Sequence, residues 1–365
     1  MHTCSVRIVR RPIVVRAATP ATKDLSKSRE SRPENVAGDF FVDHTCIDCD
    51  TCRSMAPAVY GRVGDQSAVT HQPTSSEDRV EALKALLSCP TFSIHTAHKS
   101  SQELQAAQQA LPSPVKGAEG IFFCGWNSEK SFGGNSYLLQ RPQGNILIDS
   151  PRFNPVLARR LAALGGVSYI FLTHRDDVAD HAKWAKHFGC PRIIHKGEVN
   201  EDTAACEIQL EGEGPWGPPE TLPLSSGHAS ASSVPDTVSD SKEGSATADD
   251  VTFIWTPGHT EFHVCMYHPA SHTLFAGDHL AGAGVYDNSI QTALGKGVPP
   301  SGVPELFVYK DFNWWSFPEQ LKSVEKLLKW DFLRVLPGHG RMALLKDSSQ
   351  RMQAVSNLLQ RWTQE

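Results

Sequence analysis

The feature that most constrains this chain is a run of ionisable side chains directly after a short apolar segment. Residues 167–172 read V-S-Y-I-F-L, which predicts a buried strand because β-branched and aromatic residues are grouped there. Residues 173–181 then read T-H-R-D-D-V-A-D-H, which places two histidines and three aspartates within nine residues. Carboxylates and imidazoles this close destabilise one another unless a cation lies between them. The stretch therefore predicts a metal-binding loop at the carboxyl end of a strand.

Three later segments repeat this arrangement. Each has a glycine beside a His or Asp and follows an apolar run: T-P-G-H-T at 256–260, A-G-D-H at 276–279 and L-P-G-H-G at 336–340. A polar loop that only begins a helix, where Asp is favoured anyway, would not need such partners. We therefore expect the four segments to meet at one metal centre.

These segments resemble the metallo-β-lactamase fold in its glyoxalase II-like form, over residues 120–341. That family carries H-x-H-x-D-H, followed by a His, a bridging Asp and a last His. The residues that match this pattern are His174, Asp180, His181, His259, Asp278 and His339. The resemblance implies an α+β architecture for this part of the chain, an αββα sandwich of two mixed sheets with helices outside.

The sequence departs from the family pattern at the second His. Asp176 stands there, and two extra residues separate it from Asp180. In an extended chain residues i and i+2 point to the same side, so Asp176 is expected to bind the same ion as His174. Asp177 would point away and cap the following helix. The two extra residues leave the opposite assignment open, in which Asp177 is the ligand and Asp176 is not.

The resemblance also implies how the ligands are divided between two metal positions. The first position is implied to be formed by His174, Asp176 and His259. The second is implied to be formed by Asp180, His181 and His339. Asp278 would bridge the two, and Asp180 and Asp278 are expected to serve in catalysis as well. Carboxylate in place of imidazole adds hard oxygen donors, which favours iron or manganese over zinc among the one or two ions (Fe, Mn or Zn) expected.

A second cluster of metal-binding residue types lies near the N-terminus. Cys46, Cys49 and Cys52 form C-I-D-C-D-T-C, and Cys89 is followed by proline. Clustered cysteines in a chain of this size indicate metal rather than disulfides. The spacing resembles bacterial-type ferredoxins, and because Ala56 replaces the cysteine that would ligate another cluster, it implies one 4Fe–4S cluster. A four-cysteine zinc knuckle is the structural alternative.

Composition divides the chain further. The first 17 residues contain four Arg and no acid, which is typical of an organelle transit peptide, with an unstructured tail as the alternative. The V-R-A-A ending resembles a green-algal chloroplast leader, which implies the chloroplast stroma. We expect a leader at 1–33, a ferredoxin-like domain at 38–98, a linker at 99–118 and the sandwich domain at 119–365, with a low-complexity insertion at 212–250. The formal charge of −5 disfavours nucleic acid as a partner, and no apolar run is long enough to span a bilayer.

Periodicity predicts the remaining elements. Further strands are expected at residues 121–126, 136–140, 146–148, 192–195, 251–256, 264–268, 273–276 and 332–336. Helices are expected at 155–164 and 181–188, and from residues 316 and 348 onward. Asp149 resembles a position that supports the metal loop without binding metal. The aromatic run F-N-W-W-S-F at 312–317 fits either a substrate wall or a packed core.

Two classes of function compete. The main hypothesis is a metal-dependent hydrolase of a small ester or thioester, with water activated by metal and a 4Fe–4S domain attached. The alternative is an iron-dependent oxidoreductase that receives electrons from the cluster, with a ferredoxin-type donor or reductase as partner. A non-enzymatic redox-sensing binding protein is the third interpretation. Fold alone does not decide among them.

Overall fold

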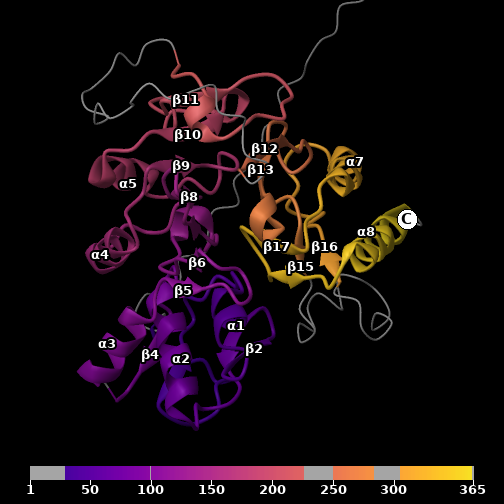
Figure 1. The fold of residues 1–365 in the computed structure, drawn as a ribbon. Coiled ribbons are helices and arrows are strands. Elements are labelled where there is room, and N and C mark those ends of the chain that lie inside the picture. Colours follow the sequence, from indigo (N-terminus) through magenta and orange to yellow (C-terminus); the bar gives the residue numbers. More distant parts are fainter. Residues whose placement is uncertain (1–28, 99, 226–249, 283–304, 364–365) are drawn as a thin grey trace, which may run out of the picture.

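The computed structural model describes residues 29–98, 100–225, 250–282 and 305–363. These residues form a small N-terminal domain beside a larger sandwich of two sheets, and β5 and β6 are the parts of the sandwich drawn nearest the small domain (Figure 1). Residues 1–28 of the predicted leader lie outside the described part, whereas its last residues pack on the small domain. Ser31 pairs with Asp43, and buried Arg32 donates to the carbonyl of Val63 at 3.0 Å.

The small domain has two strand pairs and two helices around one core. The strands are β1 (Phe40–Val42), β2 (Tyr60–Val63), β3 (Gln66–Val69) and β4 (Ile94–Thr96). The helices are α1 (Thr51–Met55) and α2 (Ser76–Ser88). β1 pairs with β4 and β2 with β3, all antiparallel. Ser75 caps α2 by accepting from the backbone of Asp78, as its S-S-E-D start predicts.

The predicted linker contains structure that belongs to the sandwich. Helix α3 (Ser101–Gln109) leads into β5 (Ser113–Pro114), which pairs antiparallel with the next strand and forms one edge of the large sheet. A proline is tolerated there because an edge strand leaves one row of backbone groups unpaired. The sandwich therefore begins a few residues before the predicted start at 119.

The first sheet carries the metal loop. Its seven strands run in the order β11-β10-β9-β8-β7-β6-β5, and β8 to β11 are parallel. The strands are β6 (Ile121–Phe123), β7 (Tyr137–Leu139), β8 (Ile146–Ile148), β9 (Tyr169–Phe171), β10 (Arg192–His195) and β11 (Ile208–Leu210). Helices α4 (Pro155–Ala163) and α5 (His181–Phe188) connect the parallel strands. The predicted β8, β10 and α5 have these same bounds.

The second sheet has five strands in the order β12-β13-β14-β17-β18. Its members are β12 (Thr252–Trp255), β13 (Val264–His268), β14 (Thr273–Gly277), β17 (Arg334–Pro337) and β18 (Ala343–Leu344). A separate pair, β15 (Ala281–Gly282) and β16 (Leu306–Phe307), lies beside it. Helices α7 (Phe317–Lys326) and α8 (Ser348–Thr363) cover its outer side. Short 3-10 turns lie at Glu129–Ser131, Lys196–Glu198, Pro219–Thr221, Pro269–Ser271 and Leu327–Lys329.

The two sheets share a buried apolar interior. Phe171 of the first sheet lies 4.7 Å from Phe253 of the second, and Tyr137 lies 5.9 Å from Phe275, measured between ring centroids. This core fixes the ends of β9, β14 and β17 relative to one another. The predicted αββα sandwich is therefore confirmed, and the segments with His and Asp follow strands that this core holds together.

The first residues of the predicted insertion at 212–250 have defined structure. Trp216 pairs antiparallel with Phe253 at the edge of β12, and a 3-10 turn follows at Pro219–Thr221. Trp216 is held because its indole donates to the carbonyl of Glu211 at 3.1 Å. Residues 226–249, which carry most of the low-complexity sequence, lie outside the described residues. Among the described helices, none has the length and hydropathy needed to cross a bilayer.

Candidate metal centre and cluster site

Asp149, which follows β8, holds the loop after β9 in place. The carboxylate of Asp149 accepts from the backbone N–H of Thr173 at 2.9 Å and from its hydroxyl at 3.1 Å. The same hydroxyl lies 2.9 Å from Nδ1 of His174. A hydroxyl that donates to Asp149 accepts from Nδ1–H, which leaves Nε2 of His174 with a free lone pair. Asp149 thus has the supporting place expected for it.

A first group of ligand atoms comes from three loops. The ligand atoms of His174, His259 and Asp278 all lie within 4.8 Å of one another. Nε2 of His259 is 3.7 Å from Oδ2 of Asp278, and Nε2 of His174 is 3.9 Å from the same oxygen. Burial lowers the pKa of His259 to about 4, so that its imidazole is neutral and able to bind metal near pH 7.

A second group shares Asp278 with the first. The ligand atoms of Asp177, Asp278 and His339 also lie within 4.8 Å. Nε2 of His339 is 3.6 Å from Oδ1 of Asp177 and 3.8 Å from Oδ2 of Asp278. Burial opposes protonation of His339, but the carboxylates of Asp278 and Asp177 outweigh it and raise its pKa to about 10. The second position is therefore rich in negative charge that a cation would neutralise.

The buried atoms of this centre fit metal ions. Within the described chain five of them have no hydrogen-bond partner: Nε2 of His174, Nδ1 and Nε2 of His259, Oδ2 of Asp177 and Oδ1 of Asp278. Leaving such groups buried and unsatisfied costs about 1–3 kcal/mol each. Imidazole nitrogens and carboxylate oxygens arranged in two groups that share one Asp suit two divalent ions. The donor set is the one that the fold implies, apart from the residues corrected below.

The structure revises the assignment of the two adjacent aspartates. The side chain of Asp177 is 2% exposed and belongs to the second ligand group, whereas that of Asp176 is 48% exposed. Oδ2 of Asp176 lies 3.9 Å from Nε2 of His174, at the rim of the first group. The expectation that Asp177 caps the next helix is wrong, because α5 begins at His181. Residues 173–177 bend instead of running extended, so the two-residue alternation does not apply.

The Asp180–His181 pair lies outside both ligand groups, which corrects the predicted second position. Asp180 accepts from the backbone of Phe153 at 2.9 Å and from Lys130 at 3.1 Å. Nδ1 of His181 accepts from Arg192 at 3.5 Å, and burial together with the charge of Arg192 lowers the pKa of His181. The two extra residues in the motif carry this pair past the centre and into the start of α5. Asp177 takes the predicted place of Asp180.

Three buried residues that the sequence did not single out also surround the centre. The ring of His263 lies 5.2 Å from that of His174, and the ring of His279 lies 5.5 Å from that of His263. His263 follows His259 by four residues, and His279 follows Asp278, so proximity in the motifs was the available signal. Glu198 accepts from the backbone of Arg175 at 3.1 Å and ties the metal loop down. Nothing in the sequence near Glu198 pointed to this role.

The four predicted cluster ligands surround a small cavity. Cys46, Cys49, Cys52 and Cys89 line it together with apolar and hydroxyl side chains. Burial, with smaller contributions from the neighbouring Cys89 and Cys46, raises the pKa of Cys49 to about 12. Four thiolates in one buried place need a positively charged group between them, which a 4Fe–4S cluster supplies. Among the described residues the cysteines are free thiols, so no disulfide competes with this role.

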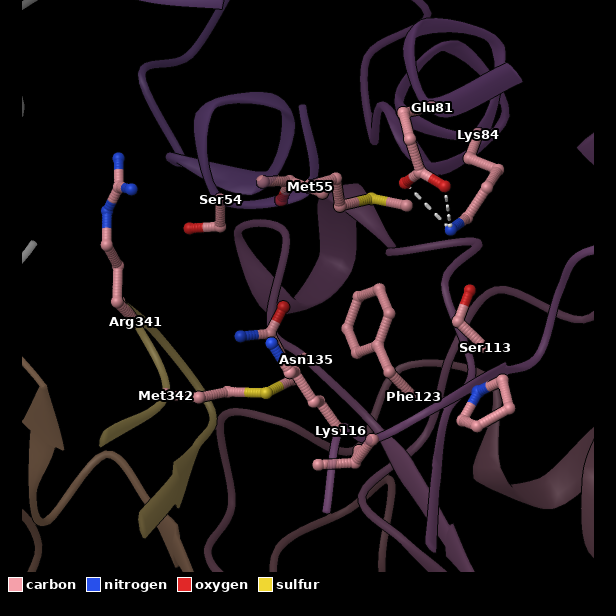
Figure 2. Close-up of a pocket in the computed structure, with 14 residues that line it drawn as sticks. Ser54, Met55, Glu81, Lys84, Ser113, Lys116, Phe123, Asn135, Arg341 and Met342 are labelled. Atoms are coloured by element: carbon pink, nitrogen blue, oxygen red, sulfur yellow. Dashed lines mark hydrogen bonds and ion pairs between the residues drawn. The ribbon is translucent and has the colours of Figure 1, made fainter. Parts of the chain in front are cut away.

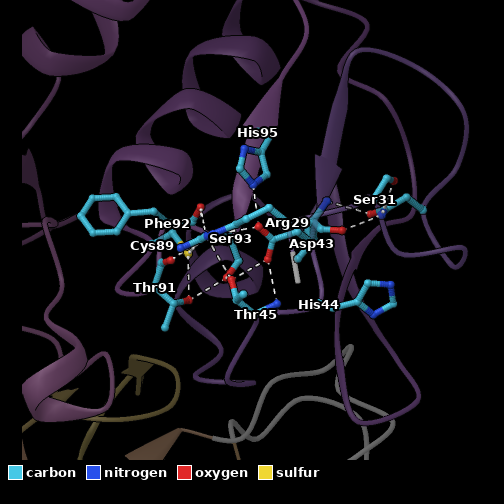
Figure 3. Close-up of polar contacts among 12 residues, drawn as sticks. Arg29, Ser31, Asp43, His44, Thr45, Cys89, Thr91, Phe92, Ser93 and His95 are labelled. Carbon is cyan, nitrogen blue, oxygen red and sulfur yellow. Dashed lines mark hydrogen bonds and ion pairs between the residues drawn. The ribbon is translucent and has the colours of Figure 1, made fainter. Parts of the chain in front are cut away.

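A polar network holds the last of these cysteines (Figure 3). Buried Asp43 accepts from the backbone of Thr45 at 2.8 Å and lies 2.7 Å from Nε2 of His95. The hydroxyl of Thr45 lies 2.7 Å from that of Ser93, whose backbone N–H donates to Sγ of Cys89 at 3.2 Å. The network therefore positions Cys89, which is far in sequence from the other three ligands.

Two consecutive glycines lie between the cluster cysteines and the metal centre. A Cβ added to Gly133 would lie 2.9 Å from Sγ of Cys49, and one added to Gly134 would lie 2.6 Å from Oδ1 of Asp177. Both distances are too short for a real side chain. The backbone of this loop is therefore in contact with a cluster ligand on one side and a metal ligand on the other.

Exposed aromatic side chains flank the metal centre. Phe132 is 52% exposed and its ring lies 6.3 Å from that of His339. Trp314 is 63% exposed and its ring lies 6.5 Å from that of His259. The F-N-W-W-S-F run, which fitted either a wall or a core, thus contributes an exposed tryptophan beside one ligand. Exposed large apolar groups at such a place indicate a binding surface.

A cavity of about 330 Å³ lies between the two domains. Met55 and Lys84 of the small domain face Phe123 and Met342 of the sandwich across it (Figure 2). Lys84 is paired with Glu81 of its own helix at 2.8 Å, so its charge is already neutralised. The cavity shows that the domain interface is hollow on this side.

Comparisons with known proteins agree with this geometry. The family described as "Metallo-beta-lactamase superfamily" matches residues 131–339, and that described as "4Fe-4S single cluster domain of Ferredoxin I" matches residues 42–96. No curated protein matched the chain.

Solved structures with a similar chain path include three metallo-β-lactamase proteins. One is a metallo-β-lactamase from Pontibacter korlensis, with 11% identity, a TM-score of 0.40, and coverage of 67% of this chain and 98% of that one. The DIM-1 metallo-β-lactamase has 14% identity, a TM-score of 0.40, and coverage of 67% and 95%. An archaeal superfamily protein from Sulfolobus tokodaii has 15% identity, a TM-score of 0.35, and coverage of 61% and 79%.

The metallo-β-lactamase match covers more than half of the chain and ends at His339, the last residue of the second ligand group. The ferredoxin match contains all four cluster cysteines. This protein therefore belongs to the metallo-β-lactamase superfamily and carries a single-cluster 4Fe–4S domain ahead of its metallo-β-lactamase domain.

Proposed function

We propose that this protein is a metal-dependent hydrolase that acts on a small ester or thioester. The observation that carries the proposal is the sharing of Asp278 between two groups of ligand atoms. Metal ions held there would supply a nucleophilic water near neutral pH and polarise a substrate carbonyl. In this arrangement Asp278 fixes the spacing of the two positions, and the Thr173–His174 contact fixes the orientation of one imidazole.

The open side of the centre sets the proposed substrate class. Phe132 and Trp314 are exposed on opposite ligands, beside His339 and His259. An acyl or aryl group packed against these rings would remove apolar surface from water, which stabilises binding by about 25 cal/mol per Å² buried. Asp176, half exposed at the rim, is proposed to complete the first position, as the family pattern suggested. An apolar ester or thioester is therefore the substrate that we expect.

The test compares metal-loaded full-length protein with an Asp278→Ala variant on aryl esters and acyl thioesters. Loss of the shared carboxylate should remove metal from both positions and abolish hydrolysis. Asp65→Ala, which removes an exposed carboxylate in the small domain, should change neither. Hydrolysis that persists after chelation, or in the Asp278→Ala protein, would contradict the proposal.

A second candidate is an iron-dependent oxidoreductase, and a specific observation favours it. Gly133 and Gly134 bring a cluster ligand and a metal ligand onto the same short loop. Such proximity has no role in hydrolysis, whereas electron transfer from a cluster to an iron site needs a short path between the two. The partners of this candidate would be a small oxidised substrate and a ferredoxin-type donor or reductase. Anaerobic iron-loaded protein that consumes a low-potential donor only when an oxidant is added would support it.

The compartment stays a proposal that rests on the leader. The Arg-rich, acid-free composition of its first 17 residues supports import into the chloroplast stroma, where reduced ferredoxin-type donors fit the second candidate. A fusion of residues 1–33 to a fluorescent protein tests it. Fluorescence in the stroma of a green cell is expected, and cytosolic fluorescence would contradict it.

A further inference from the structure

The loop that holds Gly133 and Gly134 contacts both redox-relevant sites of the chain. We propose that this dipeptide, clamped by Thr51 and Asn127, is the path by which a cluster held by the four cysteines passes an electron to the position formed by Asp177, Asp278 and His339. The inference rests on the second candidate function, because it requires iron at that position.

On the cluster side, the loop lies directly against a cysteine ligand. The missing Cβ of Gly133 would be 2.8 Å from Cβ and 2.9 Å from Sγ of Cys49, and 3.3 Å from Pro90. The φ angle of Gly133 is +85°, which side-chain-bearing residues rarely adopt. Glycine is thus required twice, by the space and by the backbone. Because Gly133 has no side chain, its backbone lies directly against Sγ of Cys49.

Thr51 connects the sulfur to the same loop through a hydroxyl. Oγ1 of Thr51 lies 3.3 Å from Sγ of Cys49 and donates to the carbonyl of Gly133 at 3.3 Å. Thr51 is buried, so water does not compete for these contacts. Hydrogen bonds to cluster sulfurs are one of the means by which proteins set cluster potentials. The hydroxyl has one proton, so it donates either to the carbonyl of Gly133 or to the sulfur, and through these two contacts Thr51 influences both the cluster potential and the placement of the loop.

Asn127 holds the dipeptide from the sandwich side. Its Nδ2 donates to the carbonyl of Gly133 at 2.8 Å and to that of Gly134 at 3.1 Å, and the residue is buried. Asn135, just after the dipeptide, donates its backbone N–H to the carbonyl of Gly338 at 2.6 Å. Gly338 immediately precedes His339. The loop is thus held next to His339, one of the three ligands of the second metal position.

On the metal side, the missing Cβ of Gly134 would lie 2.6 Å from Oδ1 of Asp177. With about 3.8 Å between consecutive Cα atoms, the path from Sγ of Cys49 to Oδ1 of Asp177 is roughly 12 Å at most. Electrons tunnel readily over such a distance through bonded and hydrogen-bonded atoms. A contact that only held the domains together would be served by apolar side chains, without backbone against a ligand at both ends.

The transfer balances without a bond change. One electron leaves a reduced cluster, which goes from the 1+ to the 2+ state, and a ferric ion at the second position becomes ferrous. A low-potential one-electron donor, dithionite in the test, reduces the cluster beforehand. The role assigned to Gly133 and Gly134 is positional, because they provide the path and take no part in proton transfer.

The test uses full-length protein with its cluster and with ferric iron at the second position. After reduction of the cluster, rapid freezing and paramagnetic resonance follow the decay of the reduced-cluster signal, while Mössbauer spectra follow ferric loss. Thr51→Val keeps the side-chain shape but removes the hydroxyl, and should slow the decay several-fold. Thr51→Ser restores a hydroxyl and should restore the rate.

Thr91→Val is the matched control. Thr91 stands two residues after Cys89, as Thr51 stands two residues after Cys49, and its hydroxyl lies 3.8 Å from the sulfur of Cys89. The hydroxyl of Thr91 contacts Cys89 and Ser93 of the small domain rather than the glycine loop, so its variant should keep the wild-type transfer rate. Cluster iron and bound ferric iron are quantified in every variant, so that a rate change is separated from loss of either site.

Three outcomes would overturn the inference. The first is a reduced cluster that persists beside ferric iron in the wild-type protein. The second is a Thr91→Val variant that slows the decay as much as Thr51→Val does. The third is a Thr51→Val variant with an unchanged rate. If wild-type protein instead takes up no iron at the second position, both this inference and the second candidate function fail. Failure of transfer in iron-loaded protein leaves the metal centre itself intact.

Discussion

Replacing Asp177 distinguishes the structure-based ligand set from the one that the motif implies. Asp177→Asn keeps the side-chain volume but removes one of three donors from the second position and one of its two carboxylates. Removal of a partner outside the ligand shell typically costs 10–100-fold in metal affinity, so loss of this direct ligand should cost at least about 100-fold. One equivalent of bound metal should therefore be lost at micromolar concentrations.

Asp176→Asn is the matched variant, because it makes the same chemical change one residue earlier. Asp176 lies at the rim of the first group with its carboxylate half exposed. Its loss should weaken the first position and leave the second occupied. Metal equivalents are counted after titration with manganese, which the four cluster irons do not obscure, and thermal melting confirms that both variants fold. Loss of the second equivalent from Asp176→Asn but not from Asp177→Asn would refute the assignment.

Three further predictions follow from particular contacts. Asp180→Asn should keep both metal equivalents and lower the free energy of unfolding by about 1 kcal/mol, because Asp180 binds only a backbone N–H and lysine side chains. Metal analysis and thermal melting check this prediction. Loss of metal would show that Asp180 is a ligand after all. Trp314→Ala should raise KM for apolar esters several-fold with little change in kcat, whereas Trp315→Ala, which changes the adjacent exposed tryptophan, should leave KM unchanged. Equal effects of the two substitutions would show that Trp314 does not contact the substrate. Burial alone would raise the pKa of Asp43, but its hydrogen bonds to Thr45 and His95 hold it below the usual value. The ionised carboxylate of Asp43 stabilises the fold by about 2 kcal/mol, fully above pH 4, and this stabilisation is lost as the pH falls through the lowered pKa of the folded state. The free energies of unfolding of wild type and Asp43→Asn should therefore differ at pH 6 and converge in acid. A difference that grows in acid would contradict the sign.

The sequence predicted the frame of the metal centre because each ligand follows a strand with a clear period. His174, His259, Asp278 and His339 stand where apolar runs end, and the shared core of the two sheets brings those ends together. Local pattern and tertiary packing point to the same answer there. The sandwich and the attached ferredoxin-type domain could therefore be predicted from the sequence.

The sequence could not give the path of the chain between those strand ends. Two extra residues in the motif shift Asp180 into the start of α5 and bring Asp177 to the centre, and this depends on bends that spacing does not record. Glu198 reaches the metal loop from a distant turn by packing alone. The contact of Gly133 with Cys49 arises from docking of the two domains, and that of Gly134 with Asp177 from packing within the sandwich, so the local sequence records neither.

Elemental analysis combined with Mössbauer spectroscopy on anaerobically purified full-length protein tests the central claim most directly. The account predicts about four iron and four sulfide from one cluster, with additional metal that disappears in Asp278→Ala while the cluster remains. Cys89→Ser should have the opposite effect, losing the cluster and keeping the additional metal. A colourless protein that contains only zinc at the cysteines, or metal content unchanged by Asp278→Ala, would contradict it.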